Sequence, residues 1–319
     1  MSSSSFDAAA LSSLPSFVAL ETAPVLMGRK DGASIQMSDR YFENQLSVLR
    51  SLDGASFTDR IESLSQSYET VQDASIHLDS LSVGTLEHAA NNVHETYRSM
   101  PETKLLRSSF PGDCLTLPEF VRTGGNGIDF GLRAYFFREG DAPDPEDVIH
   151  RNVVGVVEET EREFERYQGG LHDYPDCCID AFMDRSPDAD APEVRSVEAL
   201  SCVREERIGA SGVSITDILP GFFEEPHAYS FFSRKFFPES DCVTAQECGR
   251  DILEGLTAAF PDRMARDIFR LNYALCFTLA HSLTPEGGEL PRVGSLGTEH
   301  VYASLPLKNA LSVPRYRSS

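Results

Sequence analysis

The stretch DPEDVIHRNVVGVVEETEREFERYQGG, residues 144–170, carries the strongest helix signal in the chain. Asp144 is a good N-cap, Pro145 fits the first helical position, and acidic residues follow in the first turn. Ile149, Val153 and the valines after them recur at helical spacing along one face. The pattern predicts one helix through residue 168, with Gly169–Gly170 as its C-cap and hinge.

Segments on both sides of this stretch add more helix and a little strand. Helical spacing predicts helices over 39–52, 56–72, 85–100 and 245–260, and a buried helix over 271–283. Short apolar runs predict strands over 17–28, 32–38, 132–137 and 299–307, the first two joined by a turn. The sequence therefore predicts an α+β fold, predominantly α-helical with a small β element.

Changes in composition divide the chain into four parts. A Ser/Ala-rich start predicts a disordered tail, and a Pro/Gly-rich passage from residue 111 marks the main boundary. The predicted parts are a tail over 1–12, an N-terminal helical part over 13–110, a Cys-containing core domain over 111–283 and a C-terminal extension over 284–319.

The charge balance bears on solubility and on partners. The formal net charge is −22, and only four of the 28 basic residues are lysines: Lys30, Lys104, Lys235 and Lys308. Such an acidic, Lys-poor surface is typical of proteins from halophilic organisms, where salt screens the repulsion. Nucleic-acid binding needs a basic footprint, which this sequence does not show, so the expected partner is a small molecule or a protein.

Hydropathy and cysteine content bear on the cellular compartment. No apolar run reaches the 18–20 or so residues of a membrane span, and the N-terminus lacks the features of a secretory signal. We therefore expect a cytoplasmic protein without a membrane segment. Its seven cysteines are then expected to be free thiols or ligands rather than a disulfide framework.

Two of those cysteines are adjacent in HDYPDCCIDAF, residues 172–182. Asp173 can cap a short helix that places Cys177 and Cys178 near its first turn, where the positive helix end favours a thiolate. Neighbouring helical residues point about 100° apart. One sulfur is therefore expected to face a cavity while the other packs inward beside Phe182.

A second group of potential ligands lies in residues 224–256. This stretch contains His227, Cys242 and Cys248, and Cys242 directly precedes a predicted helix. Thiolates and imidazoles suit zinc or an iron–sulfur cluster. We therefore predict a metal site formed by Cys177, Cys178, His227 and Cys242, with Cys248 more suited to the core.

The cysteine pair also carries a resemblance to a family. Residues 170–182 resemble the G-Y-P-x-C-C-x-x-x-F motif of a prokaryotic, mainly archaeal, family described as a domain of unknown function. Residues 228–252 are similar to a later segment of that family, in which a Pro-Cys step precedes a second cysteine. Cys242 matches the second cysteine, whereas Glu239 stands where the first is expected. The resemblance implies relatedness over about residues 145–283 and no particular activity.

Other readings of the same residues stay open. The adjacent cysteines could instead serve a thiol redox enzyme or a sulfur carrier, one as nucleophile and the other resolving. They could also be buried fillers in a helical interaction module. Arg151 and Arg185 flank the region and could bind an anion, although exposed helix arginines more often pair with acidic residues. The sequence contains no G-x-S-x-G elbow, H-E-x-x-H helix or phosphate loop.

Overall fold

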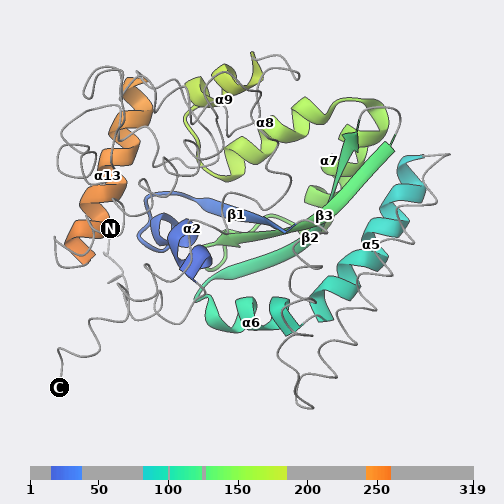
Figure 1. The fold of residues 1–319 in the computed structure, drawn as a ribbon, viewed down its shortest axis with the longest axis horizontal. Coiled ribbons are helices and arrows are strands. Elements are labelled where there is room, and N and C mark those ends of the chain that lie inside the picture. The colour runs from blue at the N-terminus through green and yellow to red at the C-terminus, as the bar shows by residue number, and fades with distance from the viewer. Residues whose placement is uncertain (1–15, 38–81, 100, 124–126, 185–241, 260–319) are drawn as a thin grey trace, which may run out of the picture. The chain divides into compact units, whose positions relative to one another are not determined.

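The computed structural model describes residues 16–37, 82–99, 101–123, 127–184 and 242–259 (Figure 1). In chain order its elements are α2 (Ser16–Leu26), β1 (Gly32–Met37), α5 (Val83–Ser99), α6 (Pro101–Ser109), β2 (Asp113–Thr123), β3 (Gly127–Phe137), α7 (Pro145–Glu158), α8 (Glu161–Leu171), α9 (Asp176–Met183) and α13 (Val243–Ala259). The fold is α+β and predominantly helical with one small sheet, as the sequence predicts.

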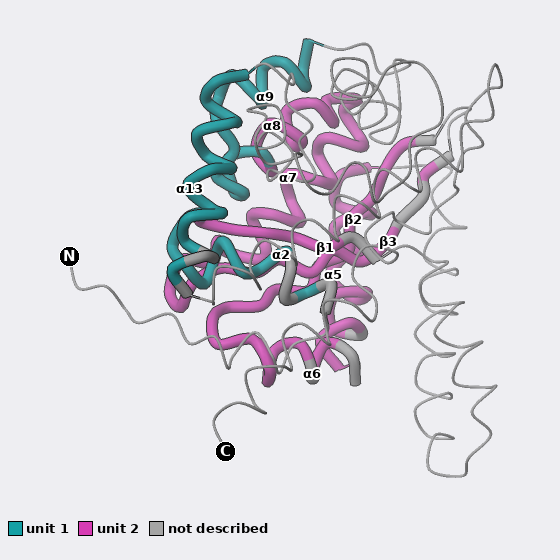
Figure 2. The backbone as a smooth tube through the Cα atoms, turned by 60° about the vertical axis from the view of Figure 1, so that its left-hand side comes forward, with its two compact units in different colours: residues 1–30, 169–319 teal, residues 31–168 magenta. Residues whose placement is uncertain are grey.

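The chain forms two compact units, coloured separately in Figure 2. Residues 31–168 make up a sheet unit, which contains all three described strands and the helices α5, α6 and α7. Residues 1–30 and 169–319 make up a cysteine unit, which contains α2, α9 and α13. The four-part division predicted from the sequence depends largely on segments outside the described residues and stays a prediction.

The sheet is antiparallel, with strand order β1-β3-β2. Residues Leu132 to Phe137 of the central strand β3 are all buried. Successive side chains of a strand point to opposite faces. Phe136 meets Phe110, at the end of α6, on one face, and Tyr135 hydrogen-bonds Gln168 of α8 on the other. Both faces of the sheet are therefore covered.

A buried polar network lies on the α8 face of this sheet. Arg133 of β3 forms a two-pronged ion pair with Glu119 of β2, and its Nη1 donates to Ser34 Oγ at 3.0 Å. The Gln168 amide donates to Glu119 at 3.2 Å and to the Tyr135 hydroxyl at 2.6 Å. Burial and the nearby Glu119 carboxylate raise the pKa of Tyr135. The network ties all three strands to α8.

Helix α7 protects the outer edge of the sheet. Strand β2 is an edge strand, and Asn152 of α7 pairs with the backbone of Phe120 in it. The Phe120 N–H donates to Asn152 Oδ1 at 2.8 Å, and Asn152 Nδ2 donates to the Phe120 carbonyl at 3.0 Å. A side-chain amide thus replaces a neighbouring strand at this point and satisfies two buried backbone groups.

Asn152→Leu is expected to lower the free energy of unfolding by about 1–3 kcal/mol, because it removes the side-chain amide that hydrogen-bonds the buried Phe120 N–H and carbonyl. Urea unfolding followed by circular dichroism measures the change. Asn91→Leu, at an exposed position of α5, is the control and should alter stability by no more than about 0.5 kcal/mol. Equal stability of Asn152→Leu and the parent would contradict the role given to this amide.

Three sequence predictions about the segments of α2, α7 and α8 are wrong. Residues 16–26 form the helix α2 rather than a strand, although 32–37 do form strand β1. Val18, Thr22, Ala23 and Val25 are all buried. A short apolar run buried on several sides lacks the periodicity that separates helix from strand. Pro24 is buried inside α2 and does not end it, and its carbonyl accepts the backbone N–H groups of Arg29 and Lys30 just beyond the end of the helix.

The second error is the single helix predicted over 144–168. Asp144 does cap it, accepting from the Glu146 N–H, but α7 ends at Glu158 because Glu159 adopts a left-handed conformation with φ 60°. Arg122 of β2 donates to the carbonyls of Val156 and Val157, which satisfies the end of α7. The chain then re-enters a helix as α8.

The third error concerns the glycine pair. Gly169 and Gly170 lie inside α8, which continues to Leu171. The left-handed residue that follows is Asp173, with φ 54°, and its N–H donates to the Gly170 carbonyl. Asp tolerates this conformation better than most residues with a side chain, so it supplies the turn predicted for glycine.

The remaining local predictions divide into two groups. The helices predicted over 85–100 and 245–260 and the strand over 132–137 are confirmed as α5, α13 and part of β3. The predicted elements over 39–52, 56–72, 271–283 and 299–307, and the tail over 1–12, lie outside the described residues. Within the described ranges, no helix has the length and apolar character needed to cross a membrane.

Candidate metal centre

Two helix starts in the cysteine unit bring three thiols together. Cys177 and Cys178 are the second and third residues of α9, which begins at Asp176. Cys242 directly precedes α13, and its carbonyl accepts the backbone N–H of Gln246 at 3.0 Å. The prediction that these cysteines lie at helix starts is confirmed. The predicted cap is wrong, because Pro175 is the N-cap of α9 and Asp173 belongs to the preceding turn.

The three sulfurs are close enough to share one ion. All three Sγ atoms lie within 4.8 Å of one another, and those of Cys177 and Cys242 are 3.7 Å apart. Cys177 is exposed, Cys242 is half-buried and Cys178 is only 1% exposed. The adjacent cysteines therefore point in different directions, as helical geometry requires. This group of three thiols could hold a metal ion.

The Tyr-Pro step sets the position of the cysteine pair. Tyr174 is 7% exposed, with the Lys30 ammonium 4.1 Å from its ring centroid and the His172 ring edge-on at 5.7 Å. Its backbone N–H donates to the Gly169 carbonyl at 3.1 Å, which closes the turn after α8. Pro175 then starts α9. The buried tyrosine anchors the turn, so Cys177 and Cys178 enter the helix at fixed positions.

Cys178 belongs to a small apolar core as well as to the thiol group. It packs with Tyr174, Ile179 and Ala245, and Phe182 borders the same core. The predicted packing of one cysteine inward beside Phe182 is confirmed. Because Ala245 comes from α13, this core joins the start of α13 to α9 beside the three sulfurs.

Burial controls the protonation of the inner cysteine. Desolvation raises the pKa of Cys178 well above its ordinary value, and the nearby thiols of Cys242 and Cys177 raise it further. Both causes disfavour an additional negative charge at this point. A cation among the three sulfurs would offset them, and the positive ends of α9 and α13 also favour thiolates there.

The other cysteines and the predicted histidine are placed as follows. Cys248 lies within α13, half-buried, and burial raises its pKa. Cys114 is buried in β2, and burial raises its pKa to about 12. Both are free thiols outside the group of three. His227, Cys202 and Cys276 lie outside the described residues, so the role predicted for His227 stays a prediction.

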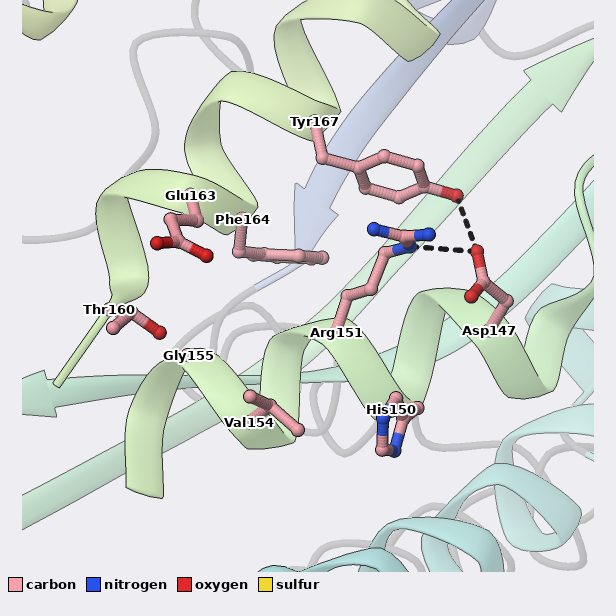
Figure 3. Close-up of a pocket in the computed structure, with 9 residues that line it drawn as sticks. All are labelled: Asp147, His150, Arg151, Val154, Gly155, Thr160, Glu163, Phe164 and Tyr167. Atoms are coloured by element: carbon pink, nitrogen blue, oxygen red, sulfur yellow. Dashed lines mark hydrogen bonds and ion pairs between the residues drawn. The ribbon is translucent and has the colours of Figure 1, made fainter. Parts of the chain in front are cut away.

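A hollow of about 270 Å³ lies between α7 and α8 in the sheet unit (Figure 3). Within it, Asp147 accepts from Arg151 Nε at 2.8 Å and from the Tyr167 hydroxyl at 3.3 Å. The guanidinium carbon lies 4.5 Å from the Tyr167 ring centroid, and the hydrogen bond from Arg151 lowers the pKa of Asp147. For Arg151 the sequence left two possibilities open, anion binding and pairing with an acidic residue. The structure shows the second, with Asp147 as the partner. Arg185 lies outside the described residues.

Comparisons with protein-family models, with curated proteins and with solved structures gave no match. The chemistry of the thiol group is therefore inferred from its own residues, and the resemblance of residues 170–182 to the archaeal family stays a prediction.

Proposed function

We propose that this protein is a metal-binding protein that holds one zinc ion through Cys177, Cys178 and Cys242. The observation that carries the proposal is the approach of three sulfurs from two helix starts to within 4.8 Å of one another. Three soft thiolate ligands at one site favour zinc and related ions over magnesium or calcium.

The spacing favours a single ion over an iron–sulfur cluster. A zinc ion that bonds two sulfurs at about 2.3 Å in tetrahedral geometry holds them about 3.8 Å apart. The Cys177 and Cys242 sulfurs are 3.7 Å apart. Iron–sulfur clusters ordinarily take four cysteines, and in a four-iron cluster each cysteine binds a different iron, which spreads the sulfurs. Three closely grouped sulfurs suit one ion better.

The coordination number separates a structural role from a catalytic one. Among the described residues, the group contains three protein ligands. Structural zinc sites close all four positions, whereas catalytic sites keep one for water or substrate. His227 is the proposed fourth ligand, and without it the fourth position belongs to solvent. An exposed Cys177 places the site within reach of solvent in either case.

Metal analysis of the full chain, purified in high salt without a metal-affinity tag, tests the proposal. We expect about one zinc per chain, and Cys178→Ser and Cys242→Ser should reduce it to near zero because two thiolates hold zinc poorly. Cys248→Ser is the matched control in α13 and should retain the parent content. His227→Ala separates a four-ligand site, which loses affinity, from a three-ligand site, which does not.

Two results would overturn the proposal. Equal zinc content in Cys178→Ser and Cys248→Ser would place the metal elsewhere. Iron with cluster absorbance in an anaerobic preparation would replace the single zinc ion by a cluster.

A further inference from the structure

We propose that peroxide oxidises Cys177 and Cys242 to a disulfide and thereby releases the metal ion. The inference rests on the proposed function, and it assigns to two of the ligands a second, redox chemistry. The sulfurs of this pair are 3.7 Å apart, and both residues are free thiols. A disulfide bond of about 2.05 Å requires the two sulfurs to approach by about 1.7 Å.

Exposure makes Cys177 the residue that peroxide attacks first. Cys177 is exposed, Cys242 is half-buried, and Cys178 is 1% exposed within an apolar core. Oxidation of a thiolate depends on access to the oxidant as well as on its charge. Cys178 is therefore shielded from peroxide although it lies next to Cys177 in the chain.

Geometry makes Cys242 the partner that completes the disulfide. Cys177 and Cys178 are consecutive residues of α9, an arrangement that holds their sulfurs poorly for the torsion of a disulfide. Cys242 comes from another segment, 65 residues away in the chain, and stands before the first residue of α13. Because Cys242 and Cys177 come from different helix starts, the torsion between their sulfurs is not restricted by a single helix as it is for Cys177 and Cys178.

The reaction balances with hydrogen peroxide as the oxidant. The Cys177 thiolate attacks one peroxide oxygen, the O–O bond breaks, and a sulfenic acid and one hydroxide form. The Cys242 thiolate then attacks the Cys177 sulfur, an S–S bond replaces the S–O bond, and a second hydroxide leaves; solvent supplies the two protons that turn both hydroxides into water. Two electrons pass from the sulfurs to peroxide, and low-molecular-weight thiols reverse the step by exchange.

Disulfide formation removes two of the three thiolate ligands. Cys178, by itself or together with the proposed ligand His227, cannot hold zinc, because protein zinc sites use three or four protein ligands. One metal ion should therefore leave for each disulfide formed. The fraction of chains that hold metal should therefore fall as the peroxide concentration rises.

Peroxide treatment of the zinc-loaded full chain tests the inference, with zinc release followed by a chromogenic chelator and disulfides mapped by mass spectrometry. We expect a Cys177–Cys242 cross-linked peptide, two thiols lost per zinc released, and recovery after dithiothreitol and zinc. Cys177→Ser, which loses zinc like the other ligand variants, is treated without metal and should give no cross-link to Cys242. Cys248→Ser should behave like the parent.

A metal-free sample treated in parallel separates the two proposals. A Cys177–Cys242 disulfide in a chain that binds no zinc would support the thiol pair and overturn the metal site. Zinc binding without this cross-link, or with Cys177–Cys178 as the main product, would leave the metal site intact and overturn the redox inference.

Discussion

Arg133→Met is expected to lower the free energy of unfolding by about 3–5 kcal/mol, because it leaves the buried Glu119 carboxylate without its ionic partner. The two side chains are only 10% and 8% exposed. In the parent, two guanidinium nitrogens of Arg133 donate hydrogen bonds to Glu119 and the third donates to Ser34. In the variant, Glu119 keeps the hydrogen bond from the Gln168 amide and loses those from Arg133. Urea unfolding followed by circular dichroism gives the difference directly.

Two controls test whether burial is the cause. Arg98→Met removes an exposed ion pair with Glu95, whose side chains are 49% and 72% exposed, and should cost less than about 1 kcal/mol. The double variant Glu119→Leu/Arg133→Met removes both charges and should be more stable than Arg133→Met alone. A loss in Arg133→Met as small as that in Arg98→Met would show that the pair is not desolvated.

Zinc is expected to raise the free energy of unfolding of the metal-free protein by about 4 kcal/mol when its free concentration is 1,000 times the dissociation constant. The physical reason is that Cys177 and Cys242, 65 residues apart, come together only in the folded chain. Binding energy at such a site is therefore folding energy. Urea unfolding at increasing zinc concentrations measures the rise.

Cys242→Ser separates this linkage from non-specific effects of zinc. Serine is a good residue at the position before a helix, so the start of α13 should be preserved while one thiolate is lost. The variant should fold and show no zinc-dependent rise of this size. A parent-like rise in Cys242→Ser would mean that zinc binds and stabilises the protein at other residues.

The thiol group could be predicted because its signals are local. Pro175 shortly before the Cys177–Cys178 pair indicates the start of one helix, and the helical pattern after Cys242 indicates the start of another. Both signals lie within a few residues of the cysteines. Helical geometry also separates adjacent side chains by about 100°, which accounts for the exposed Cys177 and the buried Cys178. Which sulfurs approach most closely depends on tertiary packing and could not be read from spacing.

Tertiary contacts also explain why strand β2 and the break between α7 and α8 were not predicted. Strand β2 was not predicted because Pro118 and its Pro/Gly-rich surroundings suggest a loop, although an edge strand tolerates proline. The break between α7 and α8 falls on Glu159, where neither glycine nor proline marks it, and Arg122 from a distant strand satisfies the helix end. Tertiary contacts override local preference at these places.

The buried ion pair also carries little sequence signal. Glu119 and Arg133 lie in strands β2 and β3, and each is a charged residue that is exposed in most proteins. Their pairing depends on strand register and on the cover that α8 provides. Arg133 is the one charged residue within the apolar run of residues 132–137, but this charge does not identify Glu119 as its partner.

X-ray absorption at the zinc edge of the full chain tests the metal site most directly, because it counts the sulfur atoms bonded to the ion. The account predicts three sulfur ligands at about 2.3 Å, with one lighter nitrogen or oxygen ligand. Cys242→Ser should reduce the sulfur count or lose the metal, and Cys248→Ser should leave the spectrum unchanged. A zinc ion bound only by nitrogen and oxygen atoms would contradict the assignment of Cys177, Cys178 and Cys242 as its ligands.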